Sequence, residues 1–267
     1  MSNTPIKVAI HGAAGRMGQR LVALGSTDDE LQIVAALDSP KHTKLGEDAG
    51  VVARLRPIGV PLKGTLDVPV DVVIDFSIPA ATMSILKMCL EKKIALVVAT
   101  TGLDAEQQKA VEEAANKIPV LWSPSMSLAV NLAMRLAQIA GRALAEHPSG
   151  VDVEIIERHH RFKEDAPSGT ALKFGELIAE EMGLTKHQHG REGRPGQRLH
   201  EEIGYHAVRT GDNPGEHTVI FGLLGETLEL TVRASNRDCY AHGALAAAKF
   251  LAGKPPKLYE MRDVLGI

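Results

Sequence analysis

The chain has 267 residues, more than the roughly 100 to 200 of a typical single domain, so we expect two domains or one domain with a large insertion. Its 44% hydrophobic and 24% charged residues are typical of a soluble globular protein. A formal net charge of −3 and 3% aromatic residues provide neither a broad cationic surface nor stacking platforms, which excludes nucleic acid as an expected partner.

The first half of the chain is predicted to be an α/β domain with a parallel sheet. Short Val- and Ile-rich segments alternate with segments of helical periodicity, and this alternation predicts right-handed βαβ crossovers. The expected strands are 6–10, 31–37, 70–76, 94–99 and 120–122, and the expected helices are 16–24, 79–92 and 104–116. Residues 39–50 are expected to form a polar loop.

After Leu128 the pattern changes. A long helix is expected to about Ala145, followed by a half-exposed strand over 151–156. Three further strand candidates lie close together in the sequence, which favours a mixed or antiparallel sheet in a second domain; we expect an α+β domain with a mixed four-stranded sheet. These candidates are 203–209, 217–223 and 227–234; residues 186–197 are expected to form a long exposed loop, and 240–251 an Ala-rich helix.

A glycine-rich segment follows the first expected strand and opens the first helix. Residues 11–18 read His-Gly-Ala-Ala-Gly-Arg-Met-Gly, one step from the standard Gly-x-Gly-x-x-Gly dinucleotide fingerprint. Gly12 permits a tight turn, Gly15 a close approach to a pyrophosphate, and Gly18 close packing of helix on strand. A tight turn without a ligand is the alternative, but the strand–turn–helix context favours dinucleotide binding.

An acidic residue, Asp38, follows the second expected strand. Its carboxylate can accept hydrogen bonds from the ribose of NAD and repels the extra phosphate of NADP, which favours NADH; a solvated strand end is the alternative. Arg16 and Lys41 are close enough in sequence to hold a 2′-phosphate, so NADPH stays a candidate beside NADH.

Two later loops also follow strand carboxyl ends, where ligands of open α/β sheets bind, although each could be an ordinary polar turn. The expected cofactor-binding residues are Gly12, Ala13, Ala14, Gly15, Arg16, Met17, Asp38, Ala99, Thr100, Thr101, Ser123, Pro124, Ser125 and Met126.

The densest group of reactive side chains lies between residues 157 and 172. Ser168 is a good helix N-cap, which leaves Gly169 and Thr170 in a first turn whose free N–H groups can hold a carboxylate. Cations and proton donors precede it, namely His159, His160, Arg161 and Lys163. The pattern predicts a site for a small polyanion that is reduced by hydride and proton. A capped helix behind a solvated basic turn is the alternative.

The same residues resemble a known family. Residues 157–171 are similar to the signature Glu-x-His-His-x-x-Lys-x-Asp-x-Pro-Ser-Gly-Thr-Ala of the dihydrodipicolinate reductases. Further similar stretches are 12–18, 75–77, 100–102, 215–217 and 261–265. The resemblance implies a Rossmann domain over 1–127 joined by 237–267, a substrate-binding and oligomerisation domain over 128–236, a hinge between them, and commonly a homotetramer.

The resemblance also implies the chemistry. NADH or NADPH would deliver hydride to 4-hydroxy-tetrahydrodipicolinate, a cyclic dicarboxylate, to give tetrahydrodipicolinate with loss of water, in lysine biosynthesis through diaminopimelate. By position, His159 and Lys163 would be the catalytic proton-donating pair, and His160, Gly169 and Thr170 would bind substrate. Because lysine is protonated at neutral pH, Lys163 is the better immediate donor, with His159 orienting or relaying.

Some positions depart from the family pattern. Ala14 replaces a common glycine, which is tolerated if its φ is negative, and Ser125 stands where asparagine is common, which puts the cofactor contacts there in doubt. His11 occupies a position where a small residue is usual, and its role stays open.

Two other classes of function stay open at this stage. One is a different two-domain reductase, although a neutral sugar would not need so many anion-binding groups; the other is a nucleotide sensor without turnover. The start of the chain carries no export signal, and Cys89 and Cys239 lack metal-ligand spacing. We therefore expect a cytoplasmic protein with reduced thiols, no metal site and no membrane segment.

Overall fold

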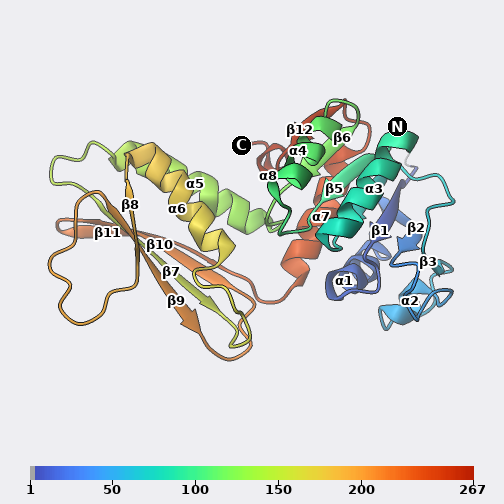
Figure 1. Ribbon diagram of the computed structural model, residues 1–267, viewed down its shortest axis with the longest axis horizontal. Coiled ribbons are helices and arrows are strands. Elements are labelled where there is room, and N and C mark those ends of the chain that lie inside the picture. The colour runs from blue at the N-terminus through green and yellow to red at the C-terminus, as the bar shows by residue number, and fades with distance from the viewer. Residues whose placement is uncertain (1–3) are drawn as a thin grey trace. The chain divides into compact units, whose positions relative to one another are not determined.

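The computed structural model describes residues 4–267 and divides into two compact units (Figure 1). Unit 1 comprises the chain up to Leu128 together with Arg237–Ile267, and unit 2 is Ala129–Asn236. The domain boundaries expected from the sequence lie after residues 127 and 236. The observed boundary between the first and second units lies one residue later than the first of these, after Leu128.

Unit 1 is built on a seven-stranded parallel sheet in the order β12-β6-β5-β4-β1-β2-β3. Its strands are β1 (Ile6–His11), β2 (Leu31–Leu37), β3 (Leu62–Lys63), β4 (Val72–Asp75), β5 (Ala95–Val98), β6 (Pro119–Trp122) and β12 (Lys257–Tyr259). Its helices are α1 (Arg16–Gly25), α2 (Ala49–Val52), α3 (Pro79–Lys92), α4 (Ala105–Ala114), α7 (Asp238–Leu251) and α8 (Met261–Leu265). The predicted Rossmann-type α/β fold is confirmed.

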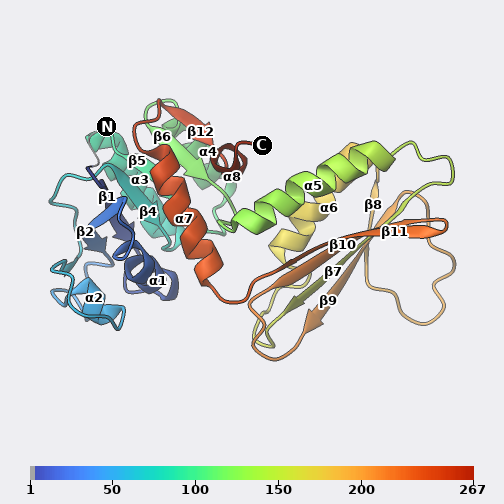
Figure 2. The same ribbon diagram turned by 180° about the vertical axis from the view of Figure 1, so that it is seen from behind.

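Helices cover both faces of this sheet. Along β1, Val8 and Ile10 point into a core shared with α1 and α7, whereas Ala9 points into a second core shared with α3 and α4. Figure 1 shows α3 and α4 in front of the strands, and Figure 2 shows α7 from the opposite side. Burial on both faces explains why the strands are continuous Val and Ile runs and not alternating ones.

Unit 2 packs two helices against one face of a mixed sheet. The elements are α5 (Leu128–Leu144), β7 (Asp152–His159), α6 (Gly169–Met182), β8 (Lys186–His189), β9 (Glu202–Arg209), β10 (Glu216–Leu223) and β11 (Glu226–Arg233). The strand order is β11-β10-β7-β9-β8; β9 runs parallel to β7 and β8, while β10 is antiparallel to β7 and β11. The mixed sheet was expected, but it has five strands and not four.

The additional strand, β8, lies in the segment expected to be a loop. Its sequence, Lys-His-Gln-His, is polar and mostly exposed, so it lacks the apolar alternation that identifies a half-buried strand. Contacts with Tyr205 on β9 hold this strand in place of apolar burial. The rings of His187 and His189 stack on the Tyr205 ring, with centroids 5.7 and 5.2 Å away. The His187 Nδ1 atom also lies 2.7 Å from the Tyr205 hydroxyl.

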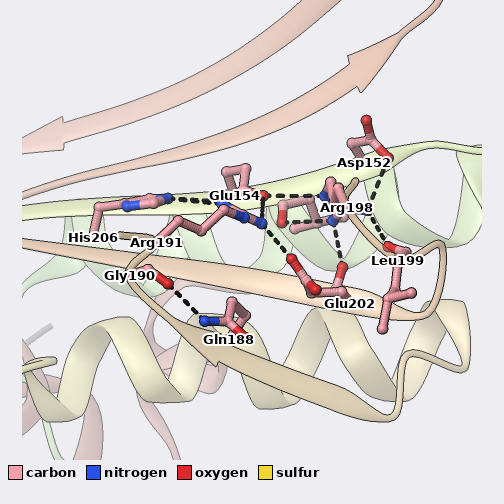
Figure 3. Close-up of polar contacts among 10 residues, drawn as sticks. Asp152, Glu154, Gln188, Gly190, Arg191, Arg198, Leu199, Glu202 and His206 are labelled. Atoms are coloured by element: carbon pink, nitrogen blue, oxygen red, sulfur yellow. Dashed lines mark hydrogen bonds and ion pairs between the residues drawn. The ribbon is translucent and has the colours of Figure 1, made fainter. Parts of the chain in front are cut away.

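The rest of that segment is tied to β7 through Glu154 (Figure 3). Arg191 donates two hydrogen bonds to the Glu154 carboxylate, at 2.7 and 3.0 Å, and Arg198 donates a third at 3.1 Å. Gly204, the register partner of Glu154 on β9, leaves room for that carboxylate, because a Cβ there would lie 1.9 Å from Glu154 Oε2. The expected exposed loop is therefore confirmed over residues 190–197, although Arg191 ties it to the sheet, and it is wrong only where β8 forms.

Several short elements escaped the sequence analysis. The strands β3 and β12 and the helices α2 and α8 have five residues or fewer, too few to show a clear period. Within the part of the chain that the structure describes, neither Cys89 nor Cys239 forms a disulfide, and burial raises the pKa of Cys89 to about 12. Among residues 4–267, no helix is both long enough and apolar enough to cross a membrane.

Candidate cofactor and active sites

The glycine-rich turn of unit 1 depends on two glycines. Gly12 has a φ of +78°, and a Cβ there would lie 2.4 Å from the Phe76 carbonyl oxygen. A Cβ on Gly18 would lie 2.1 Å from the Gly12 carbonyl oxygen. The turn therefore lies directly against the end of β4, and α1 directly against the turn, as the fingerprint requires.

The start of α1 has amide groups free for an anion. Gly15 precedes the helix in an extended conformation, with φ −69° and ψ 168°, and no side chain caps the helix. The first turn begins at the exposed Arg16 and the half-buried Met17. The N–H groups of this turn have no partner within the helix. Alanine is tolerated at position 14, because the φ of Ala14 is not positive. Among the described residues other than glycine, those with a positive φ are Arg54 and Lys93.

Asp38 joins the turn to the end of β2. Its Oδ2 atom accepts a hydrogen bond from the Ala14 amide at 2.9 Å, and its Oδ1 atom accepts one from the Ser39 amide at 2.8 Å. The buried Ala13 donates its own amide to the Leu37 carbonyl. The close backbone approach, the uncapped helix start and this carboxylate together fit the pyrophosphate and ribose of a dinucleotide.

A buried carboxylate that sequence reasoning did not single out lies beneath the turn. Asp75, at the end of β4, accepts hydrogen bonds from His11 Nδ1 at 2.7 Å, Thr82 Oγ1 at 2.6 Å and Thr100 Oγ1 at 2.9 Å. Burial acts to raise the pKa of Asp75, but the hydrogen bond and charge of His11 lower it overall. His11 therefore pairs with Asp75, and the loop at Thr100 shares the same anchor.

The two later cofactor loops lie after β5 and β6, at the sheet edge where the turn also lies. Of their residues, Thr101 and Pro124 are exposed, whereas Ala99, Thr100, Ser123, Ser125 and Met126 are buried. The Ser123 hydroxyl donates to the Ser125 carbonyl at 2.8 Å, which closes the second loop on itself. Met126 packs into the core of unit 1 and is 2% exposed, so its side chain faces the core and not the surface of the loop.

In unit 2, the predicted reaction residues flank the end of β7 and the start of α6. His159 ends β7, and Ser168 caps α6 by accepting the Ala171 amide at 3.2 Å. In the loop between them, the Lys163 ammonium lies 2.8 Å from Asp165 Oδ1 and lowers the pKa of that carboxyl. The structure thus brings the predicted proton donors and the first turn of α6 into one unit.

Glu157 is the centre of this cluster, and sequence reasoning gave it no role. Its side chain is 1% exposed, and its carboxylate accepts from His159 Nδ1 at 2.5 Å and from the Ser168 amide at 3.0 Å. Both terminal nitrogens of Arg209 also donate to it, at 2.7 and 2.8 Å. Burial acts to raise the pKa of Glu157, but the His159 and Arg209 hydrogen bonds lower it to about 2.

A second buried histidine, His217 on β10, faces the same cluster. Its ring meets that of His159 edge-on, with centroids 5.1 Å apart, and its Nε2 atom lies 3.0 Å from the Ser168 hydroxyl. Burial, and then the positive charge of His159, lowers the pKa of His217 to about 4. His217 is therefore a neutral imidazole at physiological pH.

Two of the three predicted substrate-binding residues, Gly169 and Thr170, are accessible to a ligand. A Cβ on Gly169 would meet no atom within 4 Å, and Thr170 is half-buried beside it. The Nδ1 atom of His160 is buried and has no hydrogen-bond partner among residues 4–267. An unpaired buried nitrogen carries a free-energy cost, which a bound acceptor or donor would remove.

Comparisons with known proteins match both units. Residues 6–126 match the family model for the dihydrodipicolinate reductase N-terminus, and residues 129–265 match that for its C-terminus. The chain belongs to the dihydrodipicolinate reductase family. The resemblance read from the sequence is confirmed, and with it the expectation of an oxidoreductase from a family that uses pyridine nucleotides.

Relatives in this family align with nearly the whole chain. The 4-hydroxy-tetrahydrodipicolinate reductase of Rhodopirellula baltica is 57% identical, across 100% of this chain and 98% of the relative. That of Alkalilimnicola ehrlichii is 45% identical, across 98% and 99%. A dipicolinate-bound dihydrodipicolinate reductase from Paenisporosarcina sp. TG-14 is structurally similar, with a TM-score of 0.77, 26% identity, and coverage of 96% and 98%.

Other solved dehydrogenases share the fold alone. The amine dehydrogenase of Mycobacterium smegmatis has a TM-score of 0.61 but only 12% identity, with coverage of 96% and 95%. Likeness at that identity carries no information on substrate.

Proposed function

We propose that this chain reduces 4-hydroxy-tetrahydrodipicolinate to tetrahydrodipicolinate with NADH or NADPH and a proton, with loss of the 4-hydroxyl group as water, in lysine biosynthesis through diaminopimelate. The observation that carries the proposal is the cluster around Glu157, where His159 and the cap of α6 share one buried carboxylate. Such a cluster provides both a proton and an anion site, which are the two requirements of a dicarboxylate that is reduced.

In the proposed reaction the residues of unit 2 bind and protonate the substrate. The amides of Gly169 and Thr170 hold one carboxylate at the start of α6, and the half-buried His160 contacts the substrate. Lys163 donates the proton, and His159 orients it or relays its replacement. Bound NADH or NADPH supplies the hydride.

In unit 1, the Gly12–Met17 turn would hold the pyrophosphate, and Asp38 the adenosine ribose. The loops Ala99–Thr101 and Ser123–Met126 would border the nicotinamide. NADH is the preferred cofactor in this proposal, because the Asp38 carboxylate disfavours a 2′-phosphate. The exposed cations Arg16 and Lys41 leave NADPH as a second substrate.

A coupled assay tests the activity. The purified protein is mixed with NADH or NADPH and with substrate made freshly from pyruvate and aspartate semialdehyde by the preceding synthase, and near-ultraviolet absorbance is followed. Rapid oxidation that depends on the synthase is the expected result. Binding of NADH without oxidation would favour a nucleotide sensor or a reductase for another small acid.

We further propose a cytoplasmic homotetramer whose contacts involve the face of the unit 2 sheet opposite α5 and α6. Ile156 and Val208 are exposed apolar residues on that face, 38% and 42% accessible. Light scattering coupled to size-exclusion chromatography tests this: Ile156→Asp together with Val208→Asp should reduce the mass to that of smaller species. A wild-type monomer would overturn the proposal.

A further inference from the structure

Glu157 contacts three other parts of the unit 2 cluster. Its carboxylate bonds His159 on its own strand, Arg209 on β9 and the amide of Ser168, the N-cap of α6. Its side chain is almost fully buried, so these protein groups are its partners in place of water. One carboxylate thus connects the proposed proton-handling histidine to the proposed carboxylate-binding helix start.

We propose that Glu157 is a positioning residue that fixes the tautomer of His159 and aligns its ring with the start of α6. The inference rests on the proposed function, because it assigns Glu157 a purpose only if His159 takes part in the reaction. It adds a residue that acts through His159 and does not itself touch the substrate.

The hydrogen bond to Glu157 determines which nitrogen of His159 can exchange a proton. An ionised carboxylate only accepts hydrogen bonds, so His159 Nδ1 must carry a hydrogen, and Nε2 is the nitrogen left for proton exchange. The carboxylate also lies 2.5 Å from this ring, so removing its charge should change the pH dependence of proton exchange at Nε2. A glutamine at position 157 would remove the charge and could present its N–H₂ group to Nδ1, which selects the wrong tautomer.

Other charged and titratable groups face His159 and modulate this effect. Arg209 from β9 neutralises part of the Glu157 charge, and Lys163 with its partner Asp165 lies in the following loop. His217 from β10 stays neutral, which avoids a second cation against the His159 ring. Loss of Arg209 should therefore have the opposite effect to loss of Glu157: it strengthens the pull of the carboxylate on the His159 proton.

The chain offers a matched control three residues earlier on the same strand. Glu154 also accepts hydrogen bonds from arginines, Arg191 and Arg198, and from a histidine, with His206 Nε2 at 2.7 Å (Figure 3). Burial acts to raise its pKa, but these bonds lower the pKa of Glu154 to about 2, as for Glu157. Strand alternation places Glu154 on the face opposite Val153 and Ile155, away from His159.

The experiment measures kcat against pH, at saturating substrates, for wild type and for Glu157→Gln, Glu154→Gln, Arg209→Gln and His159→Gln. In Glu157→Gln we expect kcat at neutral pH to fall about 10-fold or more, with the alkaline decline of kcat moved about one pH unit lower. In Arg209→Gln that decline should move to higher pH. Glu154→Gln should keep the wild-type position, and all variants should bind NADH as wild type does.

An unmoved alkaline decline in Glu157→Gln, or the same movement in Glu154→Gln, would overturn the proposal. Should Glu157→Gln fail to fold, judged by circular dichroism, Arg209→Gln decides alone: a decline that stays or moves to lower pH rejects the role of Glu157. The His159→Gln variant distinguishes this outcome from a failure of the proposed function. If His159 takes no part in the reaction, His159→Gln should keep the wild-type kcat and pH profile.

Discussion

His11 and Asp75 are register partners at the carboxyl ends of β1 and β4, and His11 Nδ1 lies 2.7 Å from Asp75 Oδ1. The chain winds outward in both directions from this pair of strands, since β2 and β3 lie beyond β1 and β5 and β6 beyond β4. Dinucleotides bind at such a switch in strand order. The pair therefore anchors the edge of unit 1 at which the cofactor is proposed to bind.

From this anchor we predict that Asp75→Asn weakens NADH binding about 10-fold, as expected for losing charge-assisted hydrogen bonds. An asparagine cannot accept from His11, Thr82 and Thr100 together, so the Gly12 turn and the Thr100 loop lose their common support. Fluorescence titration with NADH measures the change. Asp71→Asn, at the exposed start of the same strand, should bind NADH normally; wild-type affinity in Asp75→Asn would contradict the prediction.

Gly12→Ala should abolish NADH binding and destabilise unit 1. Alanine at a positive φ costs about 1–2 kcal/mol, and the new Cβ would also meet the Phe76 carbonyl at 2.4 Å. Gly253→Ala separates these effects, because Gly253 has a φ of +74° with no atom within 4 Å of a Cβ. Thermal unfolding should show a small loss for Gly253→Ala and a larger one for Gly12→Ala. Equal losses would remove the argument from close approach.

Asp38→Ala should lower kcat/KM for NADH more than for NADPH. Both cofactors lose something, because Asp38 also holds the Ala14 amide of the turn. Only NADH loses the carboxylate that favours its free 2′-hydroxyl, while NADPH gains from the removed negative charge. The ratio of the two kcat/KM values isolates the ribose contribution, and an unchanged ratio would reject it.

Lys163→Ala should lower kcat by about 10² to 10⁴, the usual contribution of a general acid, and His159→Ala should lower it less. NADH binding should persist in both variants, because the proposed cofactor residues belong to unit 1. Lys173→Ala is the matched control, since Lys173 pairs with Glu176 on the exposed side of α6. Wild-type turnover in Lys163→Ala would remove the proposed role.

The sequence predicted the features that depend on local pattern. The strand, glycine turn and helix at residues 6–25 were found because their signals are contiguous. The partners Arg209 and His217 were missed because only sheet register brings them to Glu157 and Ser168, about 50 residues away in sequence. Glu157 itself had a usable signal: alternation along β7 puts it on the face of Val153 and Ile155, but the expected strand ended at residue 156.

Finally, unit 2 should lose stability in acid in two stages. The pKa of His217 is lowered from 6.5 to about 4, so between these pH values the unfolded chain binds a proton at His217 that the folded chain does not. Neutral His217 therefore contributes about 3 kcal/mol to the free energy of unfolding above pH 6.5, and this contribution is lost as the pH falls to about 4. The pKa values of Glu154 and Glu157, lowered from 4.5 to about 2, add a second loss below pH 4.5. Thermal unfolding measured from pH 7 to pH 3 should show both stages in wild type. His217→Asn should lack only the first, and an unchanged first stage in that variant would assign the loss to another group.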